Sequence, residues 1–378
     1  MSVQSHKRRS CLGRVLAIAV VGLTLLCVAA LGLSALGNRN LPEGPTVLDR
    51  LDLLDKARLQ ETLHLKQELG EAVWPGWGEA DIPILIWNNG YSFLVGGDEP
   101  PAGWEPVPGD DFDGLPYYRK PTEDPQNFAV KVDGQWVASL ATKWETDNFL
   151  ISQFRQMMPA PLKPVFPYWL LIQPTEVQMS GVLHEAFHVF QAEIALDHLN
   201  AAEQAHSAGD AYWIVDVAMH SAWQNEIDAL LKALKATDPQ VMKDATQEFL
   251  TFRLKRRAEY QLDSSLIDFE REIEWEEGLA KYVELSIWRE AANTPGYVPL
   301  PALNDDADFK KYATFNQRWS QELDQMKRQA AQEGEVRFYY TGMAQAVLLD
   351  QLMPDWKTRI LSESITLEDL LNEAVQVK

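Results

Sequence analysis

The sequence predicts an α+β protein, in which a strand-rich N-terminal lobe precedes a mostly helical lobe and an apolar helix precedes both. Residues 15–36 carry no charge and form the predicted apolar helix. Short apolar runs separated by turn dipeptides occupy much of the stretch 82–172. From residue 182 onward, apolar residues recur mostly at helical spacing. Strands followed by helices are typical of the α+β class.

Composition limits the classes of function. The chain has 378 residues, of which 46% are hydrophobic, so it can bury a sizeable core. Its net charge of −21 argues against nucleic acid as a partner, because a phosphate backbone would be repelled. Both cysteines, Cys11 and Cys27, lie near the N-terminus. The rest of the chain therefore has no disulfide, no cysteine nucleophile and no cysteine metal ligand.

The uncharged stretch 15–36 is long enough to span a bilayer as a helix. Basic residues are concentrated before it, in the segment 1–14, whereas only Arg39 follows it closely. The positive-inside rule therefore predicts a single-pass membrane protein with a cytoplasmic N-terminus and its larger part outside the cytoplasm. A cleaved signal peptide, which would leave a secreted protein, is the alternative.

The part after the apolar helix is predicted to be a linker, 37–46, and one domain, 47–378, made of the lobes 47–178 and 179–378. A surface helix is expected within 47–70, and an irregular loop rich in Pro, Gly and Asp at 100–121. The predicted strands are 82–87 and 91–95 around the turn Asn89-Gly90, two runs within 128–140 around Asp133-Gly134, and 165–172 before Pro174. The last of these could pair with an extended peptide as an edge strand, or it could equally be a buried central strand.

The second lobe is predicted to be mostly helical, with a Pro-containing loop at 293–306. The predicted helices cover residues 182–195, 210–236, 239–257, 267–291, 315–331, 341–352 and 367–375.

The sequence His-Glu-Ala-Phe-His at positions 184–188 lies within the first of these helices. One helical turn separates His184 from His188, so both imidazoles leave the same face and can meet one metal ion. Glu185 lies beside them, where a carboxylate can take a proton from metal-bound water. The alternative interpretation is a helix whose two histidines are solvated or satisfied in the core.

Catalytic zinc typically has three protein ligands, so the site needs one more. The segment Trp-Glu-Glu-Gly-Leu-Ala-Lys-Tyr at 275–282 resembles the pattern around the third ligand of gluzincins, zinc peptidases that pair HExxH with a downstream Glu. This resemblance implies that Glu277 is the third ligand, with Glu276 as its nearest rival. The spacing from His188 to Glu277 is longer than in gluzincin aminopeptidases, which a helical insertion between residues 196 and 268 could explain. Gly278 is expected to allow close contact with the HExxH helix.

The segment Tyr-Tyr-Thr-Gly at 339–342, expected just before the helix 343–352, resembles the Y-x-x-G segment that supplies a transition-state tyrosine in gluzincin aminopeptidases. The resemblance implies that Tyr339 donates to the oxyanion, with Tyr340 as the alternate; a packing role is the competing interpretation. Thr341 stands where those enzymes usually carry Lys. Glu226 is expected to be an ordinary helix-face carboxylate, although it could orient a ligand histidine.

Together these segments imply a zincin-like helical lobe with a Zn²⁺ ion held by His184, His188 and Glu277. The implied function is that of a membrane-anchored zinc metallopeptidase that hydrolyses a peptide or protein substrate by a zinc-activated water. The alternative is a non-catalytic, membrane-anchored binding or scaffold protein that retains a zinc-peptidase fold. The presence of Glu185 favours the enzyme, because an inactive descendant often loses this base.

Overall fold

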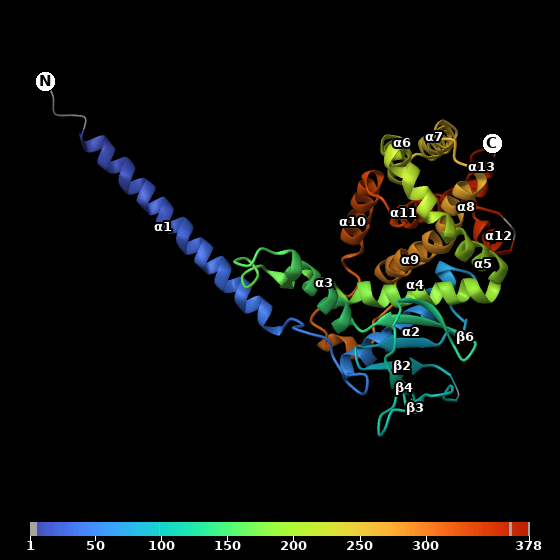
Figure 1. Ribbon diagram of the computed structural model, residues 1–378, viewed down its shortest axis with the longest axis horizontal. Coiled ribbons are helices and arrows are strands. Elements are labelled where there is room, and N and C mark those ends of the chain that lie inside the picture. Colours follow the sequence, from blue (N-terminus) through green and yellow to red (C-terminus); the bar gives the residue numbers. More distant parts are fainter. Residues whose placement is uncertain (1–5, 98, 363–364, 377–378) are drawn as a thin grey trace. The chain divides into compact units, whose positions relative to one another are not determined.

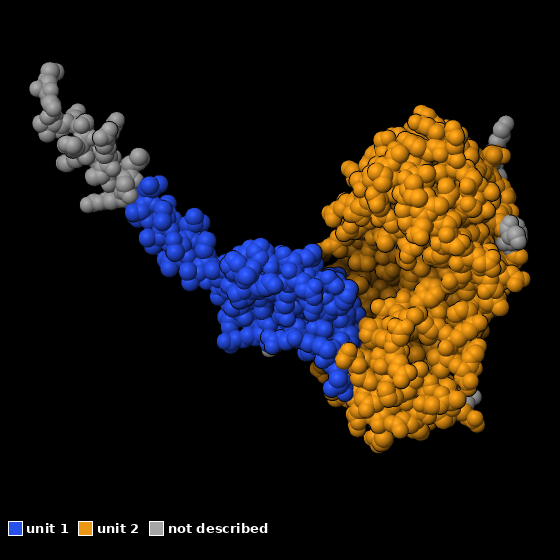
Figure 2. Space-filling view, viewed as in Figure 1, with its two compact units in different colours: residues 1–47, 142–173 blue, residues 48–141, 174–378 orange. Residues whose placement is uncertain are grey.

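The computed structural model describes residues 6–97, 99–362 and 365–376, and within them the predicted α+β class is confirmed (Figure 1). The chain divides into two compact units (Figure 2). Unit 1 comprises residues up to Val47 together with Thr142–Gln173, and unit 2 comprises Leu48–Ala141 and Pro174–Lys378. The face of unit 2 seen in Figure 2 is hollowed between its two halves.

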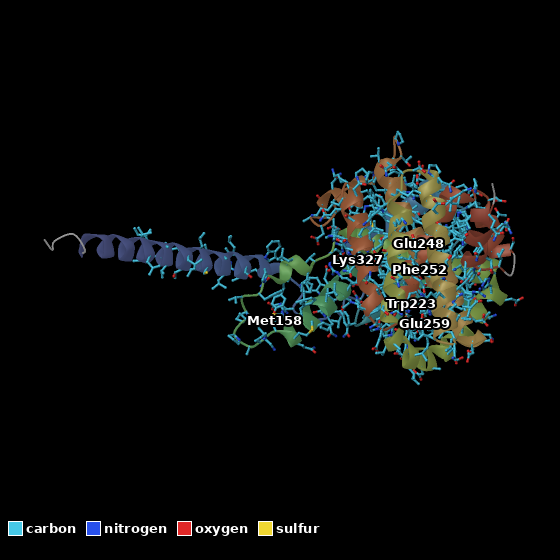
Figure 3. All side chains as sticks on the ribbon, turned by 90° about the horizontal axis from the view of Figure 1, so that it is seen from above. Met158, Trp223, Glu248, Phe252, Glu259 and Lys327 are labelled. Carbon is cyan, nitrogen blue, oxygen red and sulfur yellow. The ribbon has the colours of Figure 1, made fainter. Side chains whose placement is uncertain are left out.

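Unit 1 begins with the predicted apolar helix. Helix α1 spans His6–Gly37, and its stretch Val15–Gly37 is long and apolar enough to cross a membrane. From Val15 onward most of its large apolar side chains are exposed (Figure 3). Residues 1–5 of the predicted basic segment lie outside the described residues, as do the side chains up to residue 14.

Two predictions about unit 1 are wrong. Residues 165–172, expected as a strand, form turns and the short 3₁₀ helix η2 (Tyr168–Leu171), because Pro167 cannot donate to a strand ladder. Neither an edge strand that could pair with an extended peptide nor a central strand therefore forms there. Helix α3 (Lys143–Met157) occupies part of the stretch expected to be strand-rich; the Thr142 side chain caps it by accepting from the backbone N–H of Glu145. A second 3₁₀ turn, η1, spans Asn38–Asn40.

Unit 2 contains a six-stranded sheet with the order β3-β4-β2-β1-β6-β5. The strands are β1 (Ile84–Trp87), β2 (Tyr91–Val95), β3 (Glu105–Pro106), β4 (Tyr118–Pro121), β5 (Phe128–Val132) and β6 (Gln135–Ala141). Both predicted hairpins are confirmed, β1–β2 and β5–β6, and β1 pairs with β6 in parallel. In the second hairpin Asp133 and Gly134 both have positive φ, as a type I′ turn requires. The expected loop 100–121 instead supplies β3 and β4.

The rest of unit 2 is mostly helical, as predicted. Its α-helices are α2 (Leu53–Val73), α4 (Thr175–Ile194), α5 (Leu196–Ala205), α6 (Gly209–Lys235), α7 (Pro239–Glu259), α8 (Ser264–Ile273), α9 (Leu279–Asn293), α10 (Phe315–Arg328), α11 (Val336–Leu352), α12 (Trp356–Ser362) and α13 (Leu367–Gln376). A π-helical segment, η4 (Glu274–Gly278), joins α8 to α9, and short 3₁₀ turns lie at η3 (His206–Ala208), η5 (Pro301–Asp305) and η6 (Gln329–Ala331). Helix α2 was expected on the surface, but Leu65, Leu69 and Val73 bury it in the core.

Helix α4 is the centre of unit 2, because it contacts β6 and helices α2 and α9 (Figure 1). Val182 packs with the sheet residues Ile84 and Ile86, whereas Leu183 and Phe187 belong to the main core. A helix that is apolar on several faces is typically buried, and here burial fixes the rotation of α4 about its axis. The directions of its few polar side chains are therefore fixed as well.

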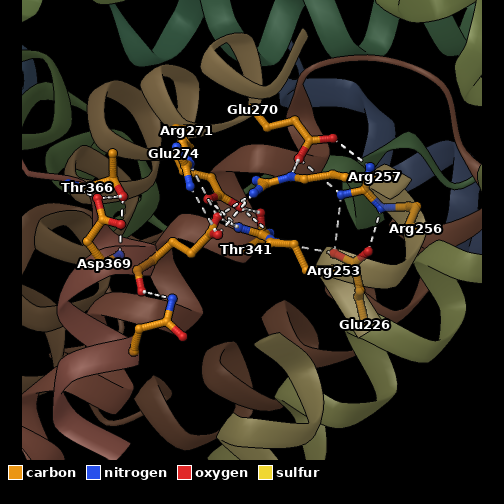
Figure 4. Close-up of polar contacts among 12 residues, drawn as sticks. Glu226, Arg253, Arg256, Arg257, Glu270, Arg271, Glu274, Thr341, Thr366 and Asp369 are labelled. Atoms are coloured by element: carbon orange, nitrogen blue, oxygen red, sulfur yellow. Dashed lines mark hydrogen bonds and ion pairs between the residues drawn. The ribbon is translucent and has the colours of Figure 1, made fainter. Parts of the chain in front are cut away.

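A buried ionic network joins helices α6, α7 and α8 to the first residue of η4 (Figure 4). Arg253 on α7 binds Glu274 through two hydrogen bonds of 2.6 and 2.8 Å, and Arg256 binds Glu226 and Glu270. Removing one partner of such a pair leaves a buried charge, which costs about 3–5 kcal/mol. Glu226 is therefore neither an exposed helix-face residue nor a partner of a motif histidine, and the network holds the first residue of η4 in place.

Candidate metal centre

The two motif histidines converge, as their spacing predicts. His184 and His188 leave one face of α4, and their Nε2 atoms lie 3.2 Å apart. His188 is fully buried and His184 nearly so. Their orientation follows from the burial of α4, since the helix cannot rotate without exposing Leu183 and Phe187.

Glu277 completes a cluster of three potential ligands. Its Oε2 lies 3.2 Å from Nε2 of His184 and 3.4 Å from Nε2 of His188. Three donors at about 2.0–2.1 Å from one ion in tetrahedral geometry would lie about 3.3–3.4 Å apart. Among the described residues, this is the group whose ligand atoms are arranged to hold a metal ion. Its donor set of two imidazoles and one carboxylate suits zinc.

The local backbone explains how Glu277 reaches the histidines. Residues Glu274–Gly278 form a π-helical segment instead of a regular α-helix. A π segment shifts the following side chains around the helix axis, and such segments occur frequently at functional sites. Within this segment Glu277 points to the two histidines and Glu276 to His206.

Gln191 fixes the tautomer of His188, a role that the sequence did not reveal. Its Nε2 donates to the carbonyl oxygens of Trp275 and Glu276, so its Oε1 faces Nδ1 of His188 at 2.9 Å. His188 therefore donates from Nδ1, which leaves the Nε2 lone pair available for a metal. The spacing could have indicated this contact, because Gln191 follows His188 by three residues and so lies on the same helix face.

Glu284 faces the Nδ1 atom of His184, as Gln191 faces that of His188. Its Oε2 lies 3.6 Å from Nδ1 of His184, and Lys281 and Arg318 also bind this carboxylate. Carboxylates commonly orient metal-binding histidines in this way. In the sequence Glu284 was one of several acidic residues near Glu277, and only the packing of α9 on α4 distinguishes it.

The charges around the histidines favour a cation. Burial alone would lower the pKa of His184, but the carboxylates of Glu277 and Glu284 outweigh it and raise this pKa to about 10. Burial alone would raise the pKa of Glu277, but His188 and His184 outweigh it and hold the pKa far below its usual range. A divalent cation can supply the positive charge that this environment favours while both imidazoles stay neutral.

Glu185 lies outside the ligand cluster but close to it. It is buried, its Oε2 has no hydrogen-bond partner among the described residues, and burial raises its pKa. The nearby imidazoles of His184 and His188 oppose this rise. A buried carboxylate left without a partner beside a ligand cluster is placed to receive a proton.

The structure separates Glu277 from its rival Glu276. The Oε2 atom of Glu276 lies 3.0 Å from Nε2 of His206, a residue at the start of η3. Glu335 approaches the other ring nitrogen of His206 at 3.4 Å. Glu276 thus forms its own ion pair and does not enter the metal cluster.

The structure also separates the two tyrosines. The ring of Tyr339 stacks on that of His184 with centroids 6.2 Å apart. Burial and then the nearby Glu277 carboxylate raise the pKa of Tyr339, so its phenol stays protonated. Tyr340 instead binds Glu322 and lies beneath Lys281. Both belong to α11, which begins at Val336 and not, as predicted, after the tyrosines.

Two glycines allow α11, the helix that carries Tyr339, to pack directly against η4. A Cβ atom on Gly278 would lie 2.5 Å from the Cα of Gly342, and one on Gly342 would lie 2.8 Å from the Cα of Gly278. The backbones of η4 and α11 therefore touch where these residues cross. The predicted contact of Gly278 with the HExxH helix is wrong; its contact is with α11.

We expect Gly342→Ala to lower the free energy of unfolding by about 1–3 kcal/mol, because the new methyl group must push two backbones apart. Gly181→Ala on α4 is the matched control, since its Cβ would meet only Leu140 at 3.4 Å and alanine favours helix. Denaturant titration of both variants measures the difference. Equal stability of Gly342→Ala and the parent would show that the crossing is not as close as described.

No known protein family, curated protein or solved structure matches this chain.

Proposed function

We propose that the chain is a membrane-anchored zinc metallopeptidase of gluzincin type, with a zincin-like helical lobe. The observation that carries this proposal is the convergence of His184, His188 and Glu277 at ligand-to-ligand distances of 3.2–3.4 Å. A buried cluster with this donor set suits a catalytic zinc ion, which keeps one position for water. We assign the three residues as ligands.

Zinc, when bound, lowers the pKa of water toward neutrality and polarises a carbonyl group. Glu185 accepts a proton from the attacking water and later gives it to the leaving amine. Gln191 and Glu284 hold the two imidazoles in the orientation and tautomer needed for ligation.

Tyr339 serves as the oxyanion donor in this proposal. Its ring lies against His184, and its phenol stays protonated because burial and Glu277 raise its pKa. A preorganised donor of this kind stabilises the negative charge that develops on the carbonyl oxygen during attack. Tyr340, directed toward Glu322, is not assigned a role in catalysis.

The test is digestion of a peptide library by the zinc-loaded full-length protein and by two matched variants. Tyr339→Phe should lower the rate by about 10²–10³-fold, the usual effect of removing an oxyanion donor. Tyr340→Phe should cleave like the parent, since its hydroxyl faces Glu322. No cleavage by the parent, with zinc bound, would favour the binding-protein alternative; equal effects of the two variants would remove the role of Tyr339.

We further propose that α1 anchors the protein with its N-terminus in the cytoplasm and unit 2 outside it. The length and apolarity of Val15–Gly37 support the anchor, and the basic residues before it support the orientation. A reporter enzyme fused after Lys378 should be active only outside the cytoplasm. Cytoplasmic activity would reverse the orientation, and a mature protein that starts after Gly32 or Gly37 would mean a cleaved signal.

A further inference from the structure

The segment 142–173 of unit 1 is attached to the end of the apolar helix. Ser34 donates from its Oγ to the carbonyl oxygen of Val165 at 2.7 Å, and Asn38 donates from its side chain to that of Phe166, also at 2.7 Å. The indole of Trp169 lies against Gly37, where a Cβ atom would be 2.6 Å from its ring. The segment therefore sits at the level where the span ends.

A second set of contacts attaches the beginning of α3 to the residues that follow the span. The Glu145 carboxylate accepts hydrogen bonds from both the backbone N–H and the hydroxyl of Thr46. The indole of Trp144 donates to the carbonyl oxygen of Gly44 at 2.9 Å. Both ends of the segment 142–173 are thus fixed to the C-terminal end of α1 and the residues just after it.

The exposed surface of this segment is almost uncharged. Its exposed large apolar side chains include Met157, which is 65% exposed, and Leu170, which is 61% exposed. Among its exposed residues only Lys163 carries a charge, although 24% of the whole chain is charged. Single exposed apolar residues are ordinary, but a whole segment of them marks an interaction surface. The exposed apolar and aromatic residues are Trp144, Phe149, Met157, Leu162, Trp169 and Leu170.

A basic cavity of about 440 Å³ opens beside these residues, within unit 1. Three cations, Arg39, Arg155 and Lys163, line it with a single carboxylate, that of Glu43. Arg155 is held over the ring of Tyr168, 5.1 Å from its centroid. Since Arg39 lies two residues after the end of the span, these cations lie at the depth of lipid headgroups.

We propose that the segment 142–173 is a membrane-interface element: its apolar side chains enter the boundary of the bilayer, and the basic cavity binds the phosphate of an anionic phospholipid. Aromatic residues beside a span are typical of this depth. A bilayer fits better than a protein partner because the surface is continuous with the end of the anchor. This inference depends on the proposed membrane anchor and is independent of the proposed peptidase activity.

The test uses the full-length protein in lipid nanodiscs that contain phosphatidylcholine with phosphatidylglycerol. A nitroxide is placed at position 157 (Met157→Cys) with Cys11 and Cys27 replaced by Ser, and power saturation compares its access to oxygen and to a water-soluble nickel chelate. We expect a depth of about 5–10 Å, with several-fold better access for oxygen. The control is position 254 (Leu254→Cys), an exposed apolar helix position in unit 2, where nickel should have free access.

A label on native Cys27, with Cys11 replaced, reports separately on the anchor. Nickel access at 157 equal to that at 254, with the Cys27 label in the bilayer, would overturn the interface element while leaving the anchor intact. A water-exposed Cys27 label would overturn both. In phosphatidylcholine alone the label at 157 should be shallower, and Arg155→Gln with Lys163→Gln should abolish this lipid dependence. Equal depth of the parent in both lipids would overturn the binding of anionic headgroups.

Discussion

Glu185→Gln is expected to keep its metal and to lower peptide hydrolysis by about 10²–10⁴-fold, the range of a lost general base. The carboxamide keeps the shape of the side chain but cannot accept the proton of the attacking water. Metal binding should survive because the structure places Glu185 outside the cluster of His184, His188 and Glu277. Turnover by zinc-loaded protein and metal content measured on the same sample test both halves of the prediction.

Glu193→Gln is the matched control, because it makes the same change on an exposed residue of α4. It should cleave like the parent. If Glu185→Gln also cleaved like the parent, the peptidase mechanism would be wrong. A Glu185→Gln protein that had lost its metal would instead show that Glu185 belongs to the ligand set.

Glu277→Ala should weaken metal binding by more than about 100-fold, the upper range for losing a residue that merely orients a ligand. Only two imidazoles would remain, one protein ligand fewer than a catalytic zinc site typically has. Glu276→Ala should keep the metal, because this carboxylate pairs with His206 at 3.0 Å. Competition of each variant with a chromogenic chelator measures the affinity.

Glu276→Ala is a close control for Glu277→Ala, because the two residues are neighbours in the chain. Both residues lie in the same π-helical segment and both are buried, so loss of a buried carboxylate alone cannot explain a difference. Loss of metal from Glu276→Ala with retention in Glu277→Ala would mean that the true ligand is one residue earlier. Equal retention would mean that neither residue is a ligand.

Local patterns predicted the parts of the fold that depend on local chemistry. Asn89-Gly90 and Asp133-Gly134 identified both hairpins, since such dipeptides are typical of hairpin turns, although of the two pairs only Asp133 and Gly134 have the positive φ of a type I′ turn. Helix α3 was missed although Thr142 and Glu145 stand at the spacing of a capping box. The expected strand at 165–172 is absent because Pro167, inside the apolar run, cannot donate to a strand ladder.

In the site, too, local patterns predicted some features, and others depend on how distant segments pack. His184 and His188 are one turn apart, so helix geometry alone placed their imidazoles together. Glu277 is 93 residues from His184, and its assignment depended on a resemblance to gluzincins. The roles of Gln191 and Glu284 depend on how α4, η4 and α9 pack, which no local pattern specifies.

The contact between Gly278 and Gly342 could not be predicted from either segment alone. Each glycine matches a different part of the gluzincin pattern, and neither segment by itself indicates that the two lie against one another. The structure shows that they allow η4 and α11 to cross in contact, with Tyr339 one turn before Gly342. The two glycines thus link the proposed ligand Glu277 to the proposed oxyanion donor.

The most direct test of the proposed metal centre is elemental analysis of the purified full-length protein, beside His188→Ala and the control His206→Ala. We predict about one zinc ion per chain in the parent and in His206→Ala, because His206 pairs with Glu276 outside the cluster. His188→Ala should contain none. Full retention of zinc by His188→Ala, or a parent that binds no zinc when it is supplied, would contradict the proposed centre.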